Sequence, residues 1–345
     1  MKILRGLAHL KEEIPNPILT IGNFDGVHLG HRAIFQQVIQ RAQAIGGTSV
    51  VLTFEPHPLR VLRPDQAPPV ITTLEEKMRL LDALGIQVAI HLPFTPELSA
   101  MSAQQFVEEI LWQRIGIREL YVGYDFGFGR GRTGTIASLR EMGTHLGFEV
   151  KKVGPVFIDD QVVSSSLIRR LIQQGEVQRA TFLLGRPYAL TGTLKPIERT
   201  SSHTSIVSLY GQTLAHHSSP EWAIACRESL WMADRPQCLD PEMEAKGLSA
   251  ARLFPQKELL PPPGLYAVQI LHRPGISPVE DDLAHLCHIP SPQDHCPPWL
   301  DLWEVPGEIV GENWEIAFLY RLSHWDEGVA MGWTEVEGKG VEERI

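Results

Sequence analysis

Two histidines stand three positions apart in a glycine-rich stretch near the N-terminus, TIGNFDGVHLGH (20–31). His28 and His31 follow an apolar run where a strand should turn into a helix. Glycines such as Gly22 and Gly30 let the backbone approach a ligand closely. A helix start attracts anions, and two imidazole donors beside it suit the charge that develops on a phosphorus atom during transfer. We favour a phosphate site here over the alternative in which one histidine caps the turn and the other packs.

A second candidate anion site is the stretch VSSSLIRR (163–170). Ser164 and Ser165 stand at an expected helix start, and Arg169 follows about one turn inside. A plain helix cap needs only one serine, so several hydroxyls with an arginine indicate an anion site. A chain of phosphates can bridge the two helix starts. No GxxxxGK[ST] motif occurs, so the chain is not a P-loop enzyme.

We expect no metal bound by protein ligands alone. The histidine pair lacks an obvious third ligand nearby, and a catalytic zinc site usually has three. The run CHIPSPQDHC (287–296) matches no standard zinc spacing. The four cysteines are interpreted as free thiols.

Two further stretches fall where ligand-binding loops are expected. In TFEPHP (53–58), Phe54 can stack on a flat ring or simply pack in the core. The glycine-rich stretch GYDFGFGRGRTG (123–134), with Arg130 and Arg132, suits a loop that closes over a nucleotide or an aromatic ligand. A solvated loop is the alternative, because glycine-rich loops alone are weak signals.

The first 185 residues alternate between strand and helix patterns, which predicts an α/β fold with a parallel sheet covered by helices on both faces. Ligands in such folds bind at the carboxyl ends of the strands, where the stretches above lie. The expected strands are 17–24, 48–54, 88–94, 119–126 and 148–154, and the expected helices are 31–47, 72–85, 103–116, 135–147, 165–175 and 177–185.

The second half has few long helical patterns and reads as a mostly β domain. Segments such as 259–270 and 300–322 have strand patterns separated by proline or glycine turns. We therefore predict two domains, 1–186 and 187–345, which fits the length of 345 residues.

Composition excludes several functional classes. The net charge of −10 argues against a general nucleic-acid binder. No apolar run approaches the roughly 20 residues of a membrane span, and charges occupy the place of a signal peptide's apolar centre. We expect a cytoplasmic protein without nucleic-acid or membrane partners. The sequence does not decide whether the protein forms a homo-oligomer.

Five motifs together carry a family resemblance: GNFDGVHLGH, TFEPHP, VGYDFGFGRGRTG, SSSLIRR and LLGRPY. In order and spacing they resemble the adenylyltransferase half of the bacterial bifunctional riboflavin kinase/FAD synthetase family, within the HxGH nucleotidyltransferases. The resemblance covers about residues 15 to 190. It implies a Rossmann-like domain that transfers AMP from ATP to FMN, giving FAD and pyrophosphate, with Mg2+ accompanying ATP.

The resemblance also implies roles for individual residues. The catalytic group, which would hold the phosphates and the leaving pyrophosphate, is His28, His31 and Arg169. The ATP-binding group is Gly22, Asn23, Phe24, Gly30, Ser164 and Ser165. The FMN-binding group is Phe54, Pro56, His57, Asp125 and Phe126.

The second half departs from the family's riboflavin kinase barrel. After TGTL (191–194), neither a Pro–Thr–Ala–Asn segment nor a Gly–Arg–x–x–Gly–Phe segment follows. The register places Trp299 where the family has its catalytic glutamate, and tryptophan cannot act as a base. The stretch 215–260 includes an insertion without a family counterpart. We therefore predict a degenerate, kinase-like barrel whose kinase activity is lost, retained for stability or dimer contacts rather than as a regulatory module.

Three alternatives remain open. The first is a fully bifunctional riboflavin kinase/FMN adenylyltransferase. The second is an HxGH adenylyltransferase that acts on a nicotinate or pantetheine phosphate. The third, from another class, is a non-catalytic flavin- or nucleotide-binding regulatory protein. The intact HxGH and SSSLIRR motifs argue against the third alternative.

Overall fold

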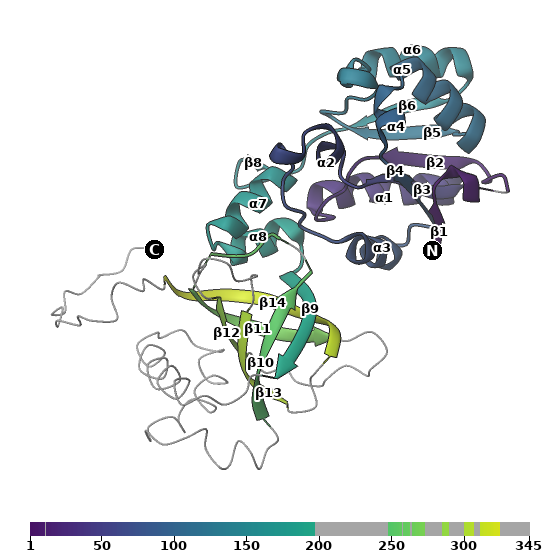
Figure 1. Ribbon diagram of the computed structural model, residues 1–345. Coiled ribbons are helices and arrows are strands. Elements are labelled where there is room, and N and C mark those ends of the chain that lie inside the picture. Colours follow the sequence, from purple (N-terminus) through teal and green to yellow (C-terminus); the bar gives the residue numbers. More distant parts are fainter. Residues whose placement is uncertain are drawn as a thin grey trace, which may run out of the picture.

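The computed structural model describes residues 1–10, 12–196, 248–256, 258–262, 264–272, 285–289, 300–306 and 311–324 (Figure 1). An α/β domain is followed by a β-barrel, which confirms the predicted fold class. Trp299, residues 215–247 and Cys226, Cys238 and Cys296 lie outside the described residues. The expectations placed on them stay predictions.

The sheet of the first domain has six parallel strands in the order β1-β4-β3-β2-β5-β6. All five residues of β2 are buried, as its apolar sequence predicts. In the chain, β3 and β4 follow β2 on one side of it, and β5 and β6 lie on its other side. The loops after β2 and β5 therefore lie at the switch point of the sheet, where ligands bind. The strands are β1 (Lys2–Arg5), β2 (Pro17–Ile21), β3 (Thr48–Glu55), β4 (Val88–Pro93), β5 (Glu119–Gly123) and β6 (Glu149–Val153).

Strand β1 was not predicted. Its four residues, KILR, carry two charges, and only Leu4 is buried. A short, half-charged segment gives no strand pattern by itself. It pairs with β4 at the edge of the sheet, where one face can remain open to water.

The predicted helices are present with ends that differ by a few residues. The helix predicted at 103–116 is divided into α5 and the π-helical η3, and short helices occur in the loops. The elements are η1 (Leu7–His9), α1 (Leu29–Ile45), α2 (Pro58–Leu62), η2 (Pro64–Gln66), α3 (Leu74–Ala83), α4 (Pro96–Ala100), α5 (Ala103–Gln105), η3 (Phe106–Ile115), η4 (Arg130–Arg132), α6 (Ile136–Leu146), α7 (Ser165–Gln173) and α8 (Val177–Leu184). A hairpin, β7 (Phe157–Ile158) with β8 (Gln161–Val162), precedes α7.

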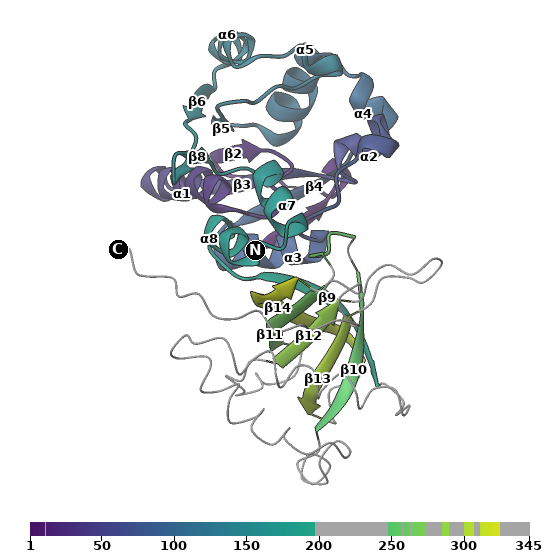
Figure 2. The same ribbon diagram turned by 90° about the vertical axis from the view of Figure 1, so that its left-hand side faces the viewer.

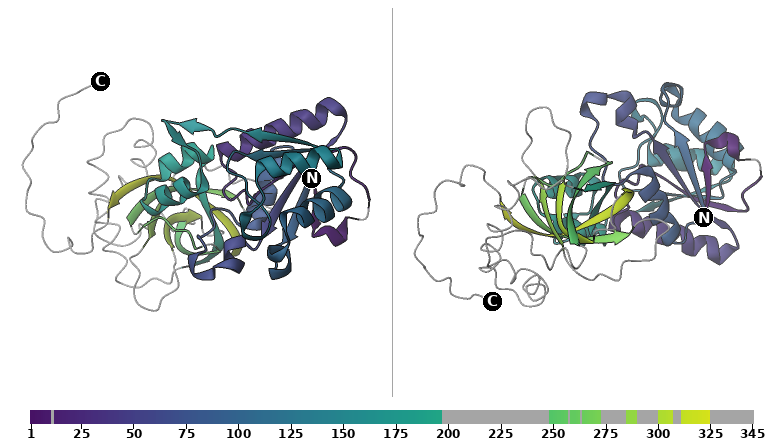
Figure 3. Two further views of the ribbon diagram at one scale, coloured as in Figure 1. Left: turned by 90° about the horizontal axis from the view of Figure 1, so that it is seen from above. Right: turned by 60° about the horizontal axis from the view of Figure 1, so that its bottom comes forward.

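The second domain is a closed barrel of antiparallel strands in the order β10-β13-β12-β11-β14-β9. Its interior continues into the apolar faces of α7 and α8, so the two domains share one core. Figure 2 shows α3 and α8 between the sheet and the barrel, and Figure 3 shows the barrel beside the sheet in both views. The strands are β9 (Tyr188–Pro196), β10 (Leu248–Pro255), β11 (Gly264–His272), β12 (His285–Ile289), β13 (Leu300–Pro306) and β14 (Gly311–His324).

Polar contacts also join the domains. The Thr191 hydroxyl on β9 donates to the Glu76 carboxylate on α3 at 2.7 Å, and both side chains are buried. Arg60 forms an ion pair with Glu258 at 2.9 Å. Within the described part of the chain, no helix combines the length and apolarity needed to cross a bilayer.

Candidate active site

The loop between β2 and α1 has an unusual backbone. Phe24 and Val27 have φ angles of 48° and 44°, and Gly26 has a φ of 87°. The left-handed region is unfavourable for a β-branched residue such as Val27, so surrounding contacts must stabilise this shape.

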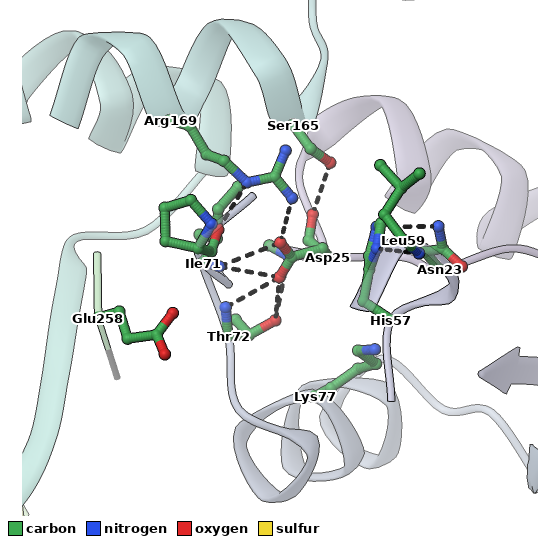
Figure 4. Close-up of polar contacts among 12 residues, drawn as sticks. Asn23, Asp25, His57, Leu59, Ile71, Thr72, Lys77, Ser165, Arg169 and Glu258 are labelled. Carbon is green, nitrogen blue, oxygen red and sulfur yellow. Dashed lines mark hydrogen bonds and ion pairs between the residues drawn. The ribbon is translucent and has the colours of Figure 1, made fainter. Parts of the chain in front are cut away.

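Asp25 supplies most of those contacts (Figure 4). Its carboxylate accepts hydrogen bonds from the Ile71 amide at 3.0 Å, and from the amide and hydroxyl of Thr72 at 3.0 and 3.2 Å. The Arg169 Nη2 donates to its Oδ2 at 2.5 Å. Asp25 therefore ties the loop after β2 to the segment before α3 and to α7. Asp25 was not among the residues predicted to form the site.

Asp25 is ionised at neutral pH although it is buried. Burial acts to raise the pKa of its carboxyl group, but the Arg169 guanidinium and the amides of Thr72 and Ile71 outweigh burial and lower the pKa below its usual value. The buried charge is therefore paired and hydrogen-bonded, as a stable fold requires.

The two histidines stack at the start of α1. Their ring centroids lie 3.5 Å apart with an interplanar angle of 19°, and the Phe24 ring lies perpendicular to the His31 ring with centroids 5.2 Å apart. His28 is the N-cap residue, and its Nδ1 accepts from the His31 amide at 3.3 Å. A neutral His28 therefore carries its proton on Nε2, which leaves an N–H available as a donor. The buried Nδ1 of His31 has no hydrogen-bond partner within the described residues.

Both histidines are neutral at pH 7. Burial lowers the pKa of His28 to about 4; the Asp25 charge opposes this change, and Arg186 and Arg169 add to it. Burial, His28 and Lys77 lower the pKa of His31. The pair thus offers uncharged N–H donors. A phosphate that binds beside the two rings would favour their protonated forms.

The start of α7 lies against the same loop, so the two predicted anion sites adjoin. Ser164 caps α7 by accepting from the Leu167 amide, and the Ser165 hydroxyl donates to the Asp25 carbonyl at 2.8 Å. Arg169 also donates from Nε to the Pro69 carbonyl at 2.8 Å. Ser165 and much of Arg169 thus hold the loop, and their action on phosphates stays a prediction.

The exit of β3 meets the loop after β2. The Asn23 side-chain amide lies 3.2 Å from the His57 Nε2, and the His57 Nδ1 accepts from the Leu59 amide at 3.2 Å. Pro56 follows a cis peptide bond with Glu55 just before this contact. One residue expected to bind ATP thus touches one expected to bind flavin.

The other predicted flavin residues lie farther along the same edge of the sheet. Phe54 packs edge-on against Phe94 with centroids 5.7 Å apart, and Phe126 stacks on Phe128 at 5.5 Å. Asp125 is exposed. No hydrogen bond, ion pair or ring contact between described residues joins these three to the histidine pair, and their flavin-binding role stays a prediction.

Two glycines allow close approach. A Cβ on Gly30 would lie 3.1 Å from the His28 ring and 3.2 Å from the Val163 carbonyl oxygen, and one on Gly22 would lie 2.9 Å from the Phe24 ring. Glycine at position 30 therefore leaves room for the stacked histidines.

Lys77 is a functional candidate that sequence reasoning missed. It lies on α3, is 4% exposed, and its Nζ approaches the Thr53 hydroxyl at 3.4 Å. The signal was present, because Lys77 occupies one position of the apolar stripe formed by Leu74, Met78 and Leu81.

The described residues contain no group of three histidine, cysteine, aspartate or glutamate side chains that could hold a metal ion. Asp25 already accepts from Arg169, Ile71 and Thr72. A metal in this site would therefore take most of its ligands from a bound substrate and from water.

Comparisons with known proteins cover the domain that contains this site. Residues 10–167 match a family model described as FAD synthetase. The chain is 35% identical over 192 residues to the bifunctional riboflavin kinase/FMN adenylyltransferase of Buchnera aphidicola (subsp. Acyrthosiphon pisum), covering 56% of this chain and 61% of that protein. It is 34% identical over 193 residues to the Escherichia coli K12 protein of the same name, covering 56% of this chain and 62% of that protein. The match therefore spans about three fifths of the length of these relatives.

One crystal structure shares both domains. A structure described as a macrolide-efflux protein from Streptococcus pneumoniae has a TM-score of 0.67, with 19% sequence identity, and the match covers 96% of this chain and 99% of that one. At this identity the likeness shows a common fold and nothing about activity.

Proposed function

We propose, from the match of residues 10–167 to the family model described as FAD synthetase, that this chain transfers AMP from ATP to FMN, giving FAD and pyrophosphate. The observation that carries the proposal is the junction of two helix starts, those of α1 and α7, through the Asp25–Arg169 pair; both starts are predicted anion sites. A triphosphate lying across both starts meets the histidine pair on one side and α7 on the other.

In the proposed reaction an oxygen of the FMN phosphate attacks the α-phosphorus of ATP. The bond from that phosphorus to the oxygen bridging to the β-phosphate breaks, and pyrophosphate leaves. His28 and His31 donate hydrogen bonds to the phosphate oxygens as charge builds on them. The α7 start, with Ser164 and Arg169, holds the leaving group. Catalysis then depends on positioning and on electrostatic stabilisation.

Magnesium enters as part of the ATP substrate. Bound to the triphosphate, it neutralises phosphate charge. We propose that the protein contributes the histidine donors and the helix starts, since Asp25 is engaged by Arg169 and Thr72.

We further propose that the barrel has lost riboflavin kinase activity and that the chain works in the cytoplasm with no nucleic-acid or membrane partner. The missing Pro–Thr–Ala–Asn segment after β9 supports the loss of kinase activity. The second candidate function is the bifunctional enzyme, which the closed barrel and the names of the relatives favour.

The experiment is to incubate the purified full chain with ATP and magnesium, once with FMN and once with riboflavin, and to separate the flavins by chromatography. We expect FAD from FMN and no phosphorylated flavin from riboflavin. FMN or FAD formed from riboflavin would establish the bifunctional candidate. Absence of FAD from FMN would overturn the proposal, and nicotinate and pantetheine phosphates as substrates would then test the related adenylyltransferases.

A further inference from the structure

The ammonium group of Lys77 is the least satisfied charge in the candidate site. It is buried, and its single contact among the described residues is the 3.4 Å approach to the Thr53 hydroxyl. A lysine ammonium has three donors, so at least two point at no described acceptor. Lysine is almost never fully buried unless it is paired, because desolvating the charge is unfavourable.

The protein itself supplies no ion-pair partner for this lysine within the described residues. Asp25 attracts the ammonium but directs its oxygens to Arg169, Ile71 and Thr72. Burial lowers the pKa of Lys77, with Asp25 and Glu55 opposing that change. An anionic ligand would therefore find a cation whose desolvation has already occurred in the folded protein.

The position of Lys77 indicates which ligand it meets. The Thr53 hydroxyl donates to the Asn23 carbonyl, so the ammonium lies beneath the loop after β2. Figure 4 shows Lys77 extending from α3 toward His57, on the other side of Asp25 from Ser165. Lys77 thus contacts β3, whereas Ser165 at the start of α7 lies beyond Asp25 in this view.

In-line attack requires the attacking and leaving groups to lie on opposite sides of the phosphorus. If pyrophosphate leaves toward α7, the attacking phosphate approaches from the β3 side. The next residues along β3 and its exit, Phe54 and His57, belong to the predicted flavin side. A flavin ring there would bring its phosphate within reach of Thr53 and Lys77.

We propose that Lys77 binds the phosphate of the flavin nucleotide and presents it to ATP, an inference that rests on the proposed function. The subsite consists of the Lys77 ammonium with the His57 ring beside it. It recognises a phosphomonoester dianion and distinguishes FMN from riboflavin.

The test uses the full chain, with Lys77→Met and Lys77→Arg. Methionine keeps the length and the helix propensity, and arginine keeps the charge. The exposed Lys152, changed to Met, is the matched control. Steady-state FAD formation gives separate KM values for FMN and ATP, and quenching of flavin fluorescence without ATP gives the affinities for FMN and riboflavin.

For Lys77→Met we expect the KM for FMN to rise about 10-fold or more, which is the usual strength of a hydrogen bond to a charged group, with the KM for ATP unchanged. The affinity for FMN should fall while that for riboflavin stays constant. Lys77→Arg should recover part of the loss. The melting temperature of Lys77→Met should not fall and should rise, because the variant removes an unpaired buried charge.

Other outcomes overturn the inference. A KM effect on ATP alone would place Lys77 with the leaving group, and unchanged kinetics with lowered stability would make it a structural residue. If the wild-type chain makes FAD and Lys77→Met matches it, the inference fails and the proposed function stands. If the wild-type chain neither makes FAD nor prefers FMN to riboflavin, both fail.

Discussion

Asp25 and Arg169 lie 144 positions apart in the chain, and their side chains meet at 2.5 Å in the candidate active site. The side chains are 5% and 11% exposed. The pair joins the loop that carries the histidines to the helix whose start adjoins them. This buried ion pair, together with the hydrogen bond from the Ser165 hydroxyl to the Asp25 carbonyl, holds the two predicted phosphate sites next to each other.

The losses of stability from removing the two members of this pair should not be additive. Arg169→Met leaves the Asp25 charge buried and unpaired, and we expect a loss of about 3–5 kcal/mol in the free energy of unfolding. The double variant with Asp25→Asn should be less destabilised than the sum of the single variants, while FAD formation stays low in all three. Urea unfolding and FAD assays check this, with the exposed Arg170→Met as control. Additive losses would show that the two side chains are not coupled.

The histidine pair should be needed for the reaction more than for the fold. His28→Asn keeps an N-cap side chain at α1 but removes the Nε2 donor. We expect FAD formation to fall about 100- to 1000-fold, which is typical for losing one donor to a developing charge. The exposed His145→Asn should retain wild-type activity. Full activity of His28→Asn would remove the histidines from the phosphate-binding role.

Stability should decline as the pH falls from about 6.5 to 4. The charged and titratable groups that face His28 are Asp25 on the same loop, His31 on α1, Arg169 on α7 and Arg186 after α8. Burial is the largest effect and lowers the pKa of His28 to about 4 in the folded state. The unfolded chain binds a proton near pH 6.5 and the folded chain does not, so acid favours unfolding.

The difference between the two pKa values of His28 corresponds to about 3 kcal/mol, and the lowered pKa of His31 acts in the same direction. The lowered pKa of Asp25 adds to the acid sensitivity only near and below its usual value of 3.8. Unfolding measured at pH 7, 6, 5 and 4 should show a shallower decline for His28→Asn than for the wild type. An identical decline in both proteins would assign the acid sensitivity to other groups.

The barrel should support the active site through α3. The bond from Thr191 to Glu76 holds the helix that carries Lys77 on its next position. Thr191→Val should lower the free energy of unfolding by about 1–3 kcal/mol, because a buried carboxylate loses a donor. A cycle with Glu76→Gln should show coupling, whereas Glu75→Gln on the exposed face should have no effect on stability. Independent effects would mean that the barrel does not brace α3.

The parallel sheet was predictable because buried strands and amphipathic helices each leave a clear periodicity. Strand β1 was missed, since four residues with two charges at an edge leave none. The strand ends also differed: the strand predicted at 119–126 ends at Gly123, where the glycine-rich loop begins.

The candidate site was predictable where residue types carry chemistry by themselves, as in His28 and His31. Asp25 was missed because its partners, Thr72 and Arg169, are remote in sequence. Lys77 was missed because a charge within an amphipathic helix is usually assigned to its exposed face. Only the packing of α3 against β3 shows that this charge is buried.

The Gly30→Ala variant tests the position of the His28 ring separately from the stability of the fold. Alanine is favoured over glycine in a helix by about 1 kcal/mol, but its Cβ would lie 3.1 Å from the His28 ring and 3.2 Å from the Val163 carbonyl oxygen. The helix gain and the close contacts should nearly cancel, so the free energy of unfolding of Gly30→Ala should stay within about 1 kcal/mol of the wild type. The ring of His28 must then shift, and displacement of a phosphate donor should reduce FAD formation about 10- to 100-fold.

Gly154→Ala is the matched control for this change, because a Cβ there meets nothing within 4 Å. It should leave activity and stability unchanged. Wild-type activity in Gly30→Ala would mean that the position of the His28 ring tolerates displacement, and the stacked pair would then be a packing feature. A loss of activity at constant stability would instead tie the rate to the position of that ring, which is what a phosphate clamp requires.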